Sequence, residues 1–252
     1  MSHYASNTLD TVIFRVDFVN PINVEDDALH RACLAIYPVS QNETVNEQSV
    51  QTSFNEKGEM IVNRSSTSYT SKKYSNRTLS RYITVSPRLV LTEVKDYISY
   101  DDTSKTFLSV FNAIRNANPD VTIARIGMRY INRVDLTAFK KTARKNYVKN
   151  VLFESAYDDV ISGGDQARTQ HLAELIIDDY RVRCITGLFN PDYPAAIKRS
   201  IVTLDFDAFI QGNVESADVQ GYLDKFHDTI QKLYEASIFA KQRELMGVIE
   251  NE

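Results

Sequence analysis

"RIGMRYINRVDL" (residues 125–136) alternates between two kinds of side chain, as a β-strand requires. In a regular strand, every second side chain points to the same face of the sheet. One face is then apolar except for Asn132, which needs hydrogen-bond partners if it is buried. The other face carries Arg125, Arg129 and Arg133. Gly127, on that second face, predicts a bulge or close packing.

The arginine row has two interpretations. Arginines four residues apart on a strand lie about 13 Å apart, so one phosphate cannot contact two of them, although a polyanion along the strand could meet them in turn. Alternatively, each arginine pairs with a carboxylate of a neighbouring strand. We favour ion pairs, because unpaired guanidinium groups on a covered sheet face are costly to desolvate. The candidate partners in other predicted strands are Asp17, Asp205 and Asp207.

The composition is that of a globular protein with an uneven distribution of charge. The chain has 252 residues, of which 43% are hydrophobic and 25% charged, and its net charge is −4. Residues 1–149 carry 20 Lys and Arg against 15 Asp and Glu, whereas residues 150–252 carry 9 against 18. This split indicates either an anion-binding half or two halves that dock on each other. The 2 cysteines and 4 histidines have no ligand spacing, so we predict no disulfide framework, metal site or cofactor.

The order of predicted elements indicates an α+β protein with two adjoining lobes, each a sheet covered by helices. Residues 11–136 read as strand, helix, several strands, helix and strand, like an elaborated ferredoxin-like βαββαβ unit. Residues 171–252 read as three strands and a long amphipathic helix. We therefore expect an N-terminal lobe, a basic and glycine-containing connection, and a C-terminal lobe at residues 1–137, 138–170 and 171–252.

Several local features can also be predicted. Asn23 is expected to cap the first helix, and Asp102 or Ser104 the second. Residues 55–58, with the sequence NEKG, read as a turn, and the same holds for SGGDQ at residues 162–166. The Ser/Thr-rich residues 65–80 are expected to form either a loop or an edge hairpin.

The opening stretch resembles the hallmark of a family of sporadically distributed bacterial proteins of about this length. That family has an R-I-G-x-R-Y-x-N core, which here is Arg125, Ile126, Gly127, Arg129, Tyr130 and Asn132. Two weaker similarities agree with it, YISYDDTSKTFLSVF at residues 97–111 and LDKFHDTIQKLYEASIFAKQRELMG at residues 223–247.

The resemblance implies no settled activity and no catalytic residues. The patchy distribution of the family is similar to that of phage-defence, toxin–antitoxin and other mobile genes. This similarity concerns where the genes occur and indicates no chemistry. Together with the uneven charge and the lack of a catalytic motif in the sequence, the resemblance leads us to expect a non-enzymatic binding or assembly component of a bacterial system, linked to phage defence or mobile elements. A protein partner is expected, and the formation of homo-oligomers is left open.

Two basic segments support an alternative, which is binding of RNA or single-stranded DNA. Residues 64–88 and 140–149 combine cations with tyrosines, a mixture that can hold phosphates and stack bases. A solvated loop or a docking surface for the acidic half is the competing interpretation. The candidate binding residues are Lys72, Lys73, Arg77, Arg81, Lys140, Lys141, Arg144 and Lys145, beside the three arginines of the row.

A second alternative is a metal-assisted nuclease that uses Asp205 and Asp207, together with the acidic pair at residues 178–179. His227 lies near Asp224 and Asp228 in the long helix, and we expect it to face solvent. The sequence has neither a signal-peptide pattern nor an apolar run long enough for a bilayer, so we expect a cytoplasmic protein without membrane contact.

Overall fold

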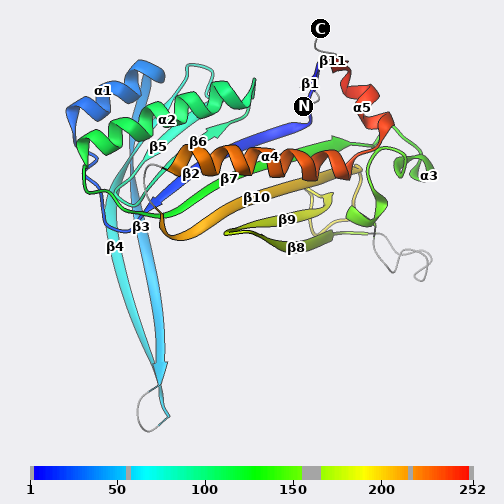
Figure 1. Ribbon diagram of the computed structural model, residues 1–252. Helices are drawn as coiled ribbons and strands as arrows, with labels where there is room; N and C mark the ends of the chain where they lie inside the picture. Colours follow the sequence, from blue (N-terminus) through cyan, green and yellow to red (C-terminus); the bar gives the residue numbers. More distant parts are fainter. Residues whose placement is uncertain (1–2, 55–57, 155–165, 215–217, 250–252) are drawn as a thin grey trace.

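Nine antiparallel strands form one sheet through the middle of the computed structural model (Figure 1). The structure describes residues 3–54, 58–154, 166–214 and 218–249. From one edge to the other, the strands are β3 (Val39–Phe54), β4 (Met60–Ser75), β5 (Arg81–Val85), β6 (Leu89–Val94), β2 (Leu9–Phe18), β7 (Ile123–Asp135), β10 (Ile201–Val214), β9 (Tyr180–Phe189) and β8 (Thr169–Ile177). A separate pair joins residues near the two termini, β1 (His3–Tyr4) and β11 (Val248–Ile249).

Helices cover one face of the sheet, which confirms the predicted α+β class. The described residues form α1 (Asp27–Ile36), α2 (Tyr100–Ala117), α3 (Lys141–Arg144), α4 (Val219–Ser237), α5 (Ala240–Met246) and the 3₁₀ turn η1 (Asn150–Leu152). The three longest, α1, α2 and α4, lie on the same face of the sheet, and α3 and α5 lie near one end of it (Figure 1). No helix in the described ranges is long and apolar enough to cross a bilayer.

β7 is the strand predicted from residues 125–136, and it lies between β2 and β10. Its expected core face is confirmed, since the following residues are buried: Ile126, Met128, Tyr130, Asn132, Val134 and Leu136. This face meets the helices. Phe14 of β2 and Phe107 of α2 pack edge to face there, with ring centroids 5.7 Å apart. Burial of large apolar side chains between sheet and helices is the main stabilising contribution of this layer.

The two predicted lobes share a single sheet. β7 from the first half pairs with β10 from the second without interruption, from Arg125↔Gln211 to Asp135↔Ile201. This ladder satisfies the backbone groups of both strands, which would otherwise be exposed edges of two sheets. The predicted connection at residues 138–170 therefore follows β7 in the sequence, but it does not divide the sheet into two. The turn predicted at residues 162–166 lies outside the described residues except for Gln166.

The arginine row lies on the face opposite the helices, and it is paired with carboxylates as predicted. Arg129 donates two hydrogen bonds to Asp205, with lengths of 2.8 and 2.6 Å. Arg125 lies 3.3 Å from Asp207 on β10 and 3.9 Å from Asp17 on β2. The row therefore ties β7 to both of its neighbours.

The rest of this face is packed in the same way. Arg133 lies 3.4 Å from Asp10, and its guanidinium carbon lies 4.2 Å from the centre of the Phe189 ring. A Cβ atom on Gly127 would lie 3.1 Å from the guanidinium carbon of Arg125. Gly127 therefore provides room for the side chain of Arg125, which is the close packing that was one of its two predicted roles.

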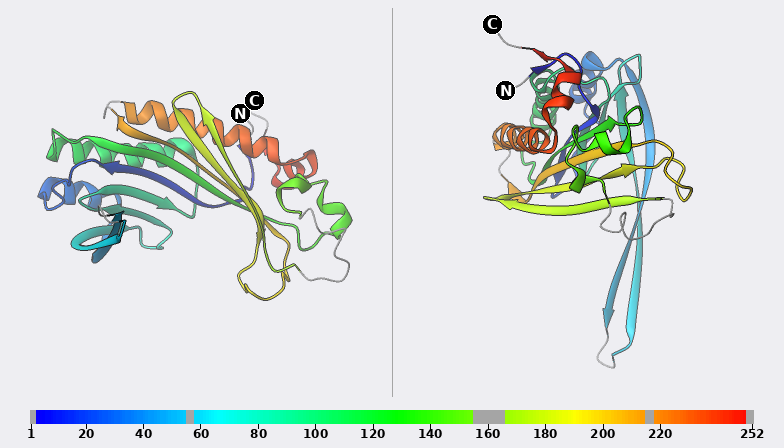
Figure 2. Two further views of the ribbon diagram at one scale, coloured as in Figure 1. Left: turned by 90° about the horizontal axis from the view of Figure 1, so that it is seen from below. Right: turned by 90° about the vertical axis from the view of Figure 1, so that its right-hand side faces the viewer.

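β3 and β4 form an arm that projects from the body of the protein (Figures 1 and 2). They pair along their whole length, but β4 pairs with β5 only at residues 72–75. Residues 43–54 and 60–71 are therefore a two-stranded ribbon, about 40 Å long at roughly 3.3 Å per residue. The edge-hairpin interpretation of the Ser/Thr-rich segment is confirmed for residues 65–75. The turn predicted at residues 55–58 falls mainly outside the described residues.

The predicted N-caps are wrong by a few residues. Asp26 caps α1 in place of Asn23, because its carboxylate accepts a 2.8 Å hydrogen bond from the N–H of Leu29. Ser99 caps α2, and its hydroxyl accepts a 3.1 Å hydrogen bond from the N–H of Asp102. Several side chains of the right type stand near each helix start, and the path of the backbone selects among them.

Arg129→Ala is expected to lower the free energy of unfolding by about 1–3 kcal/mol, because it leaves the carboxylate of Asp205 without its donor. The side chain of Asp205 is only 8% exposed, so water replaces the lost hydrogen bonds poorly. Urea denaturation measures the loss. Arg133→Ala is the matched control: the side chain of its partner Asp10 is 35% exposed. The control should therefore lose less than about 1 kcal/mol, and equal losses in the two variants would contradict the role of burial.

Candidate functional site

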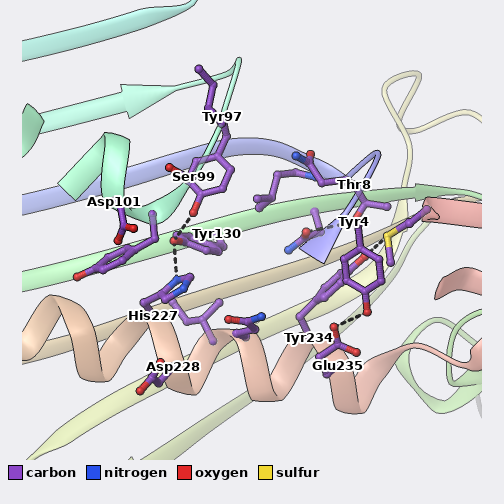
Figure 3. A pocket seen from close by; sticks show the side chains of 18 of the residues that line it. Tyr4, Thr8, Tyr97, Ser99, Asp101, Tyr130, His227, Asp228, Tyr234 and Glu235 are labelled. Carbon is purple, nitrogen blue, oxygen red and sulfur yellow. Dashed lines mark hydrogen bonds between the residues drawn. The ribbon is translucent and has the colours of Figure 1, made fainter. Parts of the chain in front are cut away.

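A cavity of about 490 Å³ lies on the helix-covered side of the sheet, between α4, the start of α2 and the strands β2 and β7 (Figure 3). Its aromatic lining consists of Tyr4, Tyr97, Tyr100, Tyr130, Tyr234 and His227. Its carboxylates are Asp101, Asp224, Asp228 and Glu235. No lysine or arginine is found among the described residues that line it.

Regular secondary structure holds most of these side chains. Tyr130 and Asn132 project from the helix-facing side of β7, where the alternation of the strand places them. α4 contributes side chains that recur at intervals of three or four residues, which is the spacing of one helix face. They are Asp224, His227, Asp228, Gln231, Tyr234 and Glu235. The floor and one wall of the cavity are therefore built on rigid elements.

His227 packs against two tyrosines of the cavity, so the expectation that it faces solvent is wrong. Its Nδ1 atom lies 3.0 Å from the hydroxyl of Tyr130. Its ring stacks on that of Tyr100, with centroids 4.3 Å apart and 9° between the planes. Both contacts come from distant parts of the chain, and Tyr130 lies 97 positions away. Only the fold brings them together.

Tyr97, Tyr130 and His227 form a chain of hydrogen bonds at one end of the cavity (Figure 3). The hydroxyls of Tyr97 and Tyr130 are 3.2 Å apart. Burial raises the pKa of Tyr97 to about 12 and raises the pKa of Tyr130 well above its ordinary value. Burial also lowers the pKa of His227 below 6.5. At neutral pH both phenols therefore keep their protons, and the imidazole is uncharged.

A second group of hydrogen bonds occupies the other end. The hydroxyl of Thr8 lies 2.7 Å from that of Tyr234 and donates a 3.1 Å hydrogen bond to the side-chain oxygen of Asn132. The amide nitrogen of Asn132 donates to the carbonyl oxygen of Leu204 at 3.3 Å. The side-chain amide of Asn132, whose partners could not be identified from the sequence, is thus hydrogen-bonded at both its oxygen and its nitrogen.

The carboxylates of the cavity differ in their partners. Glu235 accepts a 2.5 Å hydrogen bond from the hydroxyl of Tyr4 and a 2.8 Å hydrogen bond from Arg243 of α5. Asp224 accepts a 2.5 Å hydrogen bond from the hydroxyl of Tyr100. Within the described part of the chain, Glu235 is the one cavity carboxylate in an ion pair with a basic side chain. The negative charge is therefore less neutralised at the end of the cavity that holds Asp224 than at the end that holds Glu235.

The predicted binding residues lie elsewhere. Arg125, Arg129 and Arg133 are on the opposite face of β7. Residues 64–88 run from within the arm to its base and into the strands beside it, whereas residues 140–149 lie around α3 at the other end of the sheet (Figure 1). Of the remaining candidates, Arg77, Lys140, Lys141 and Lys145 are exposed, and Lys73 and Arg144 are half-buried. The fold does not join the two basic segments into one surface.

Part of the first basic segment is also paired with acids. Lys72 lies 2.7 Å from Glu25. Arg81 lies 2.6 Å from Asp96 and 2.7 Å from Asp102 at the start of α2. These cations hold β4 and β5 against the start of α2 and the segments that lead into α1 and α2, so they have structural partners in place of a phosphate.

The aspartates proposed for a nuclease form no common site. Asp205 and Asp207 are held by arginines on the open face of the sheet. Asp179 accepts a 2.5 Å hydrogen bond from the hydroxyl of Tyr222. Throughout the described ranges, no group of three or more His, Cys, Asp or Glu residues is placed to hold a metal ion.

A comparison with models of known protein families finds no match to this chain, and a comparison with curated proteins finds none either. The family resemblance therefore stays a prediction. The three stretches that carry it nevertheless meet at the cavity, since residues 97–111, 125–136 and 223–247 each contribute side chains to its lining. Alternation in β7 and the helical spacing of α4 were visible in the sequence, but the contact between them was not.

His227→Gln is expected to weaken the dependence of stability on pH. The folded protein keeps His227 uncharged at pH values where the unfolded chain protonates it, so wild-type stability falls as the pH drops below about 6.5. The variant lacks this titration, and the difference in melting temperature between variant and wild type should shrink from about pH 7.5 to about pH 5.5. Calorimetry measures it. His171→Gln, which removes an exposed imidazole on β8, is the control, and a difference that grows at low pH would contradict the assignment.

Proposed function

We propose that the protein is a non-enzymatic binding protein that holds a small organic ligand in the cavity between α2, α4 and β7. The observation that carries this proposal is the cavity itself. Its volume of about 490 Å³ falls within the range of small-molecule sites, roughly 300–1,000 Å³. Aromatic walls with a few convergent polar groups are also the usual lining of such sites.

The contacts among the polar side chains of the cavity favour ligand binding over catalysis. The imidazole of His227 is tied to Tyr130 and stacked on Tyr100. Thr8 and Tyr234 are likewise bonded to each other. Groups that hold one another fix the shape of a pocket, whereas a general acid or base needs direct reach to a proton of its substrate.

The wider role that we propose is that of a binding or assembly component in a bacterial system linked to phage defence or mobile elements. The resemblance to the sporadically distributed family supports it, and a cytoplasmic location and a protein partner belong to the same proposal. Binding of RNA or single-stranded DNA is the weaker alternative, because Lys72 and Arg81 are held by carboxylates and the two basic segments lie apart.

For the fold, we propose that the first half is a ferredoxin-like unit into which the arm is inserted. The antiparallel order β5–β6–β2–β7, with α1 and α2 on one face, supports this relation. The second half then extends the same sheet by β10, β9 and β8 and covers it with α4.

Gln231→Trp is expected to abolish retention of the ligand, because Gln231 lines the cavity from α4 and an indole there fills much of its volume. Native mass spectrometry after incubation with a metabolite extract would detect retained small molecules as mass shifts. Lys232→Trp places the same ring on the exposed side of α4 and should leave retention unchanged. If the wild type retains no small molecule, or if both variants retain it equally, the proposal fails.

Assembly through the arm is a second candidate function, which the exposed ribbon of residues 43–54 and 60–71 supports. A two-stranded ribbon without a third strand or a helix is only marginally stable in water. Near its tip, Val50, Met60 and Val62 are 57%, 62% and 41% exposed and share one face. A partner that covers this face would bury apolar surface and stabilise the ribbon.

Val62→Lys is expected to weaken recovery of a protein partner in a pull-down from the native host followed by mass spectrometry. Ile61→Lys is the matched control, because Ile61 is also 41% exposed but points to the other face of the ribbon. Partner recovery that both variants reduce equally would point to general disruption of the arm. Recovery that neither variant reduces would rule out this face as the docking surface.

A further inference from the structure

The cavity combines negative charge with electron-rich rings. Asp101, Asp224 and Asp228 all line the cavity. Asp228 follows His227 on α4, Asp101 follows Tyr100 on α2, and Asp224 accepts a hydrogen bond from the Tyr100 hydroxyl, so the three carboxylates lie at one end of it. The stacked rings of His227 and Tyr100 lie at this same end. No basic side chain among the described lining residues offsets this charge.

The acidic groups are also spread along the cavity. Asp228 follows Asp224 by four residues, and Glu235 follows Asp228 by seven, on the same face of α4. At 1.5 Å of rise per residue, these steps correspond to about 6 Å and about 10.5 Å along the helix axis. The cavity is therefore elongated in the direction of α4, with acceptors at both ends (Figure 3).

We propose that the ligand of this cavity is a linear aliphatic polyamine, an inference that rests on the proposed small-molecule binding function. One ammonium group is held by Asp224, Asp228 and Asp101. The methylene chain lies along the aromatic walls, and a second nitrogen meets the acceptors around Glu235.

Each part of such a ligand matches a feature of the lining. An ammonium group over a tyrosine face is attracted by the ring quadrupole, and the attraction grows when water is excluded. Methylene groups gain from contact with apolar ring surface. At the far end, the hydroxyls of Thr8 and Tyr234 and the carboxylate of Glu235 accept hydrogen bonds, although Arg243 already offsets the charge of Glu235.

Other classes of ligand fit less well. A phosphate or carboxylate ligand would meet carboxylates without a basic side chain to balance it, which is electrostatically unfavourable. The positive end of α2 reaches the cavity, but Ser99 caps it and Asp101 lies in its first turn. A neutral apolar ligand would bury the carboxylates without compensation.

Titration calorimetry of the full chain with spermidine tests the assignment. The wild type should bind one equivalent, and the double variant Asp224→Asn, Asp228→Asn should bind at least tenfold more weakly. Asparagine keeps an oxygen for the Tyr100 hydroxyl, so the variant removes charge and retains shape. The double variant Asp178→Asn, Glu244→Gln removes two exposed carboxylates outside the cavity and controls for the overall charge of the protein.

The outcomes separate this inference from the function on which it rests. No binding of spermidine at millimolar concentration, or equal binding by the two double variants, overturns the polyamine assignment. If a small molecule is still retained in a way that Gln231→Trp abolishes, the binding function stands with another ligand. If the wild type retains neither spermidine nor any small molecule, both proposals fall.

Discussion

The register of β7 against β2 and β10 is the constraint on which the rest of the structure depends. A strand has two faces, and a shift of one residue exchanges them completely. Such a shift would move Met128 and Tyr130 to the open face and carry Arg129 into the core, where its charge would lose both water and Asp205. Apolar burial on one side and ion pairing on the other therefore specify the same register.

Because both faces of β7 specify its register, this strand can link the sheet on one face and line the cavity on the other. On the open face, Arg125 lies between Asp207 of β10 and Asp17 of β2, so three strands are linked by one side chain. On the helix-covered face, Tyr130 meets His227 of α4. A side chain that takes part in a pocket is well placed only when its backbone cannot slide, and the ion pairs on the far side of β7 supply that condition.

The sequence predicted local features better than long-range contacts. Alternation in residues 125–136 identified the core face of β7, and the carboxylates expected to meet Arg125 and Arg129 are the ones that do. Those predictions rest on periodicity and charge, which act between neighbouring residues or strands. His227 was misplaced because its neighbours in sequence are aspartates, while its neighbours in space are Tyr100 and Tyr130. The continuity of the sheet was only partly foreseen: the expected pairing of the arginines with Asp205 and Asp207 places β10 beside β7, but the two halves were predicted to form separate sheets.

The arm poses a different physical problem, because it exposes two strands with little to cover them. Its pairs are mostly short polar side chains, such as Thr44↔Thr70 and Asn46↔Ser68. Cross-strand pairs of this kind stabilise a ribbon modestly and leave its surface soluble. Apolar side chains on both faces would invite pairing with other chains along the free edge of β3. The polar composition of the arm therefore limits unspecific association along its length, and its exposed apolar residues gather near the tip, where a partner could dock without contacting the rest of the sheet.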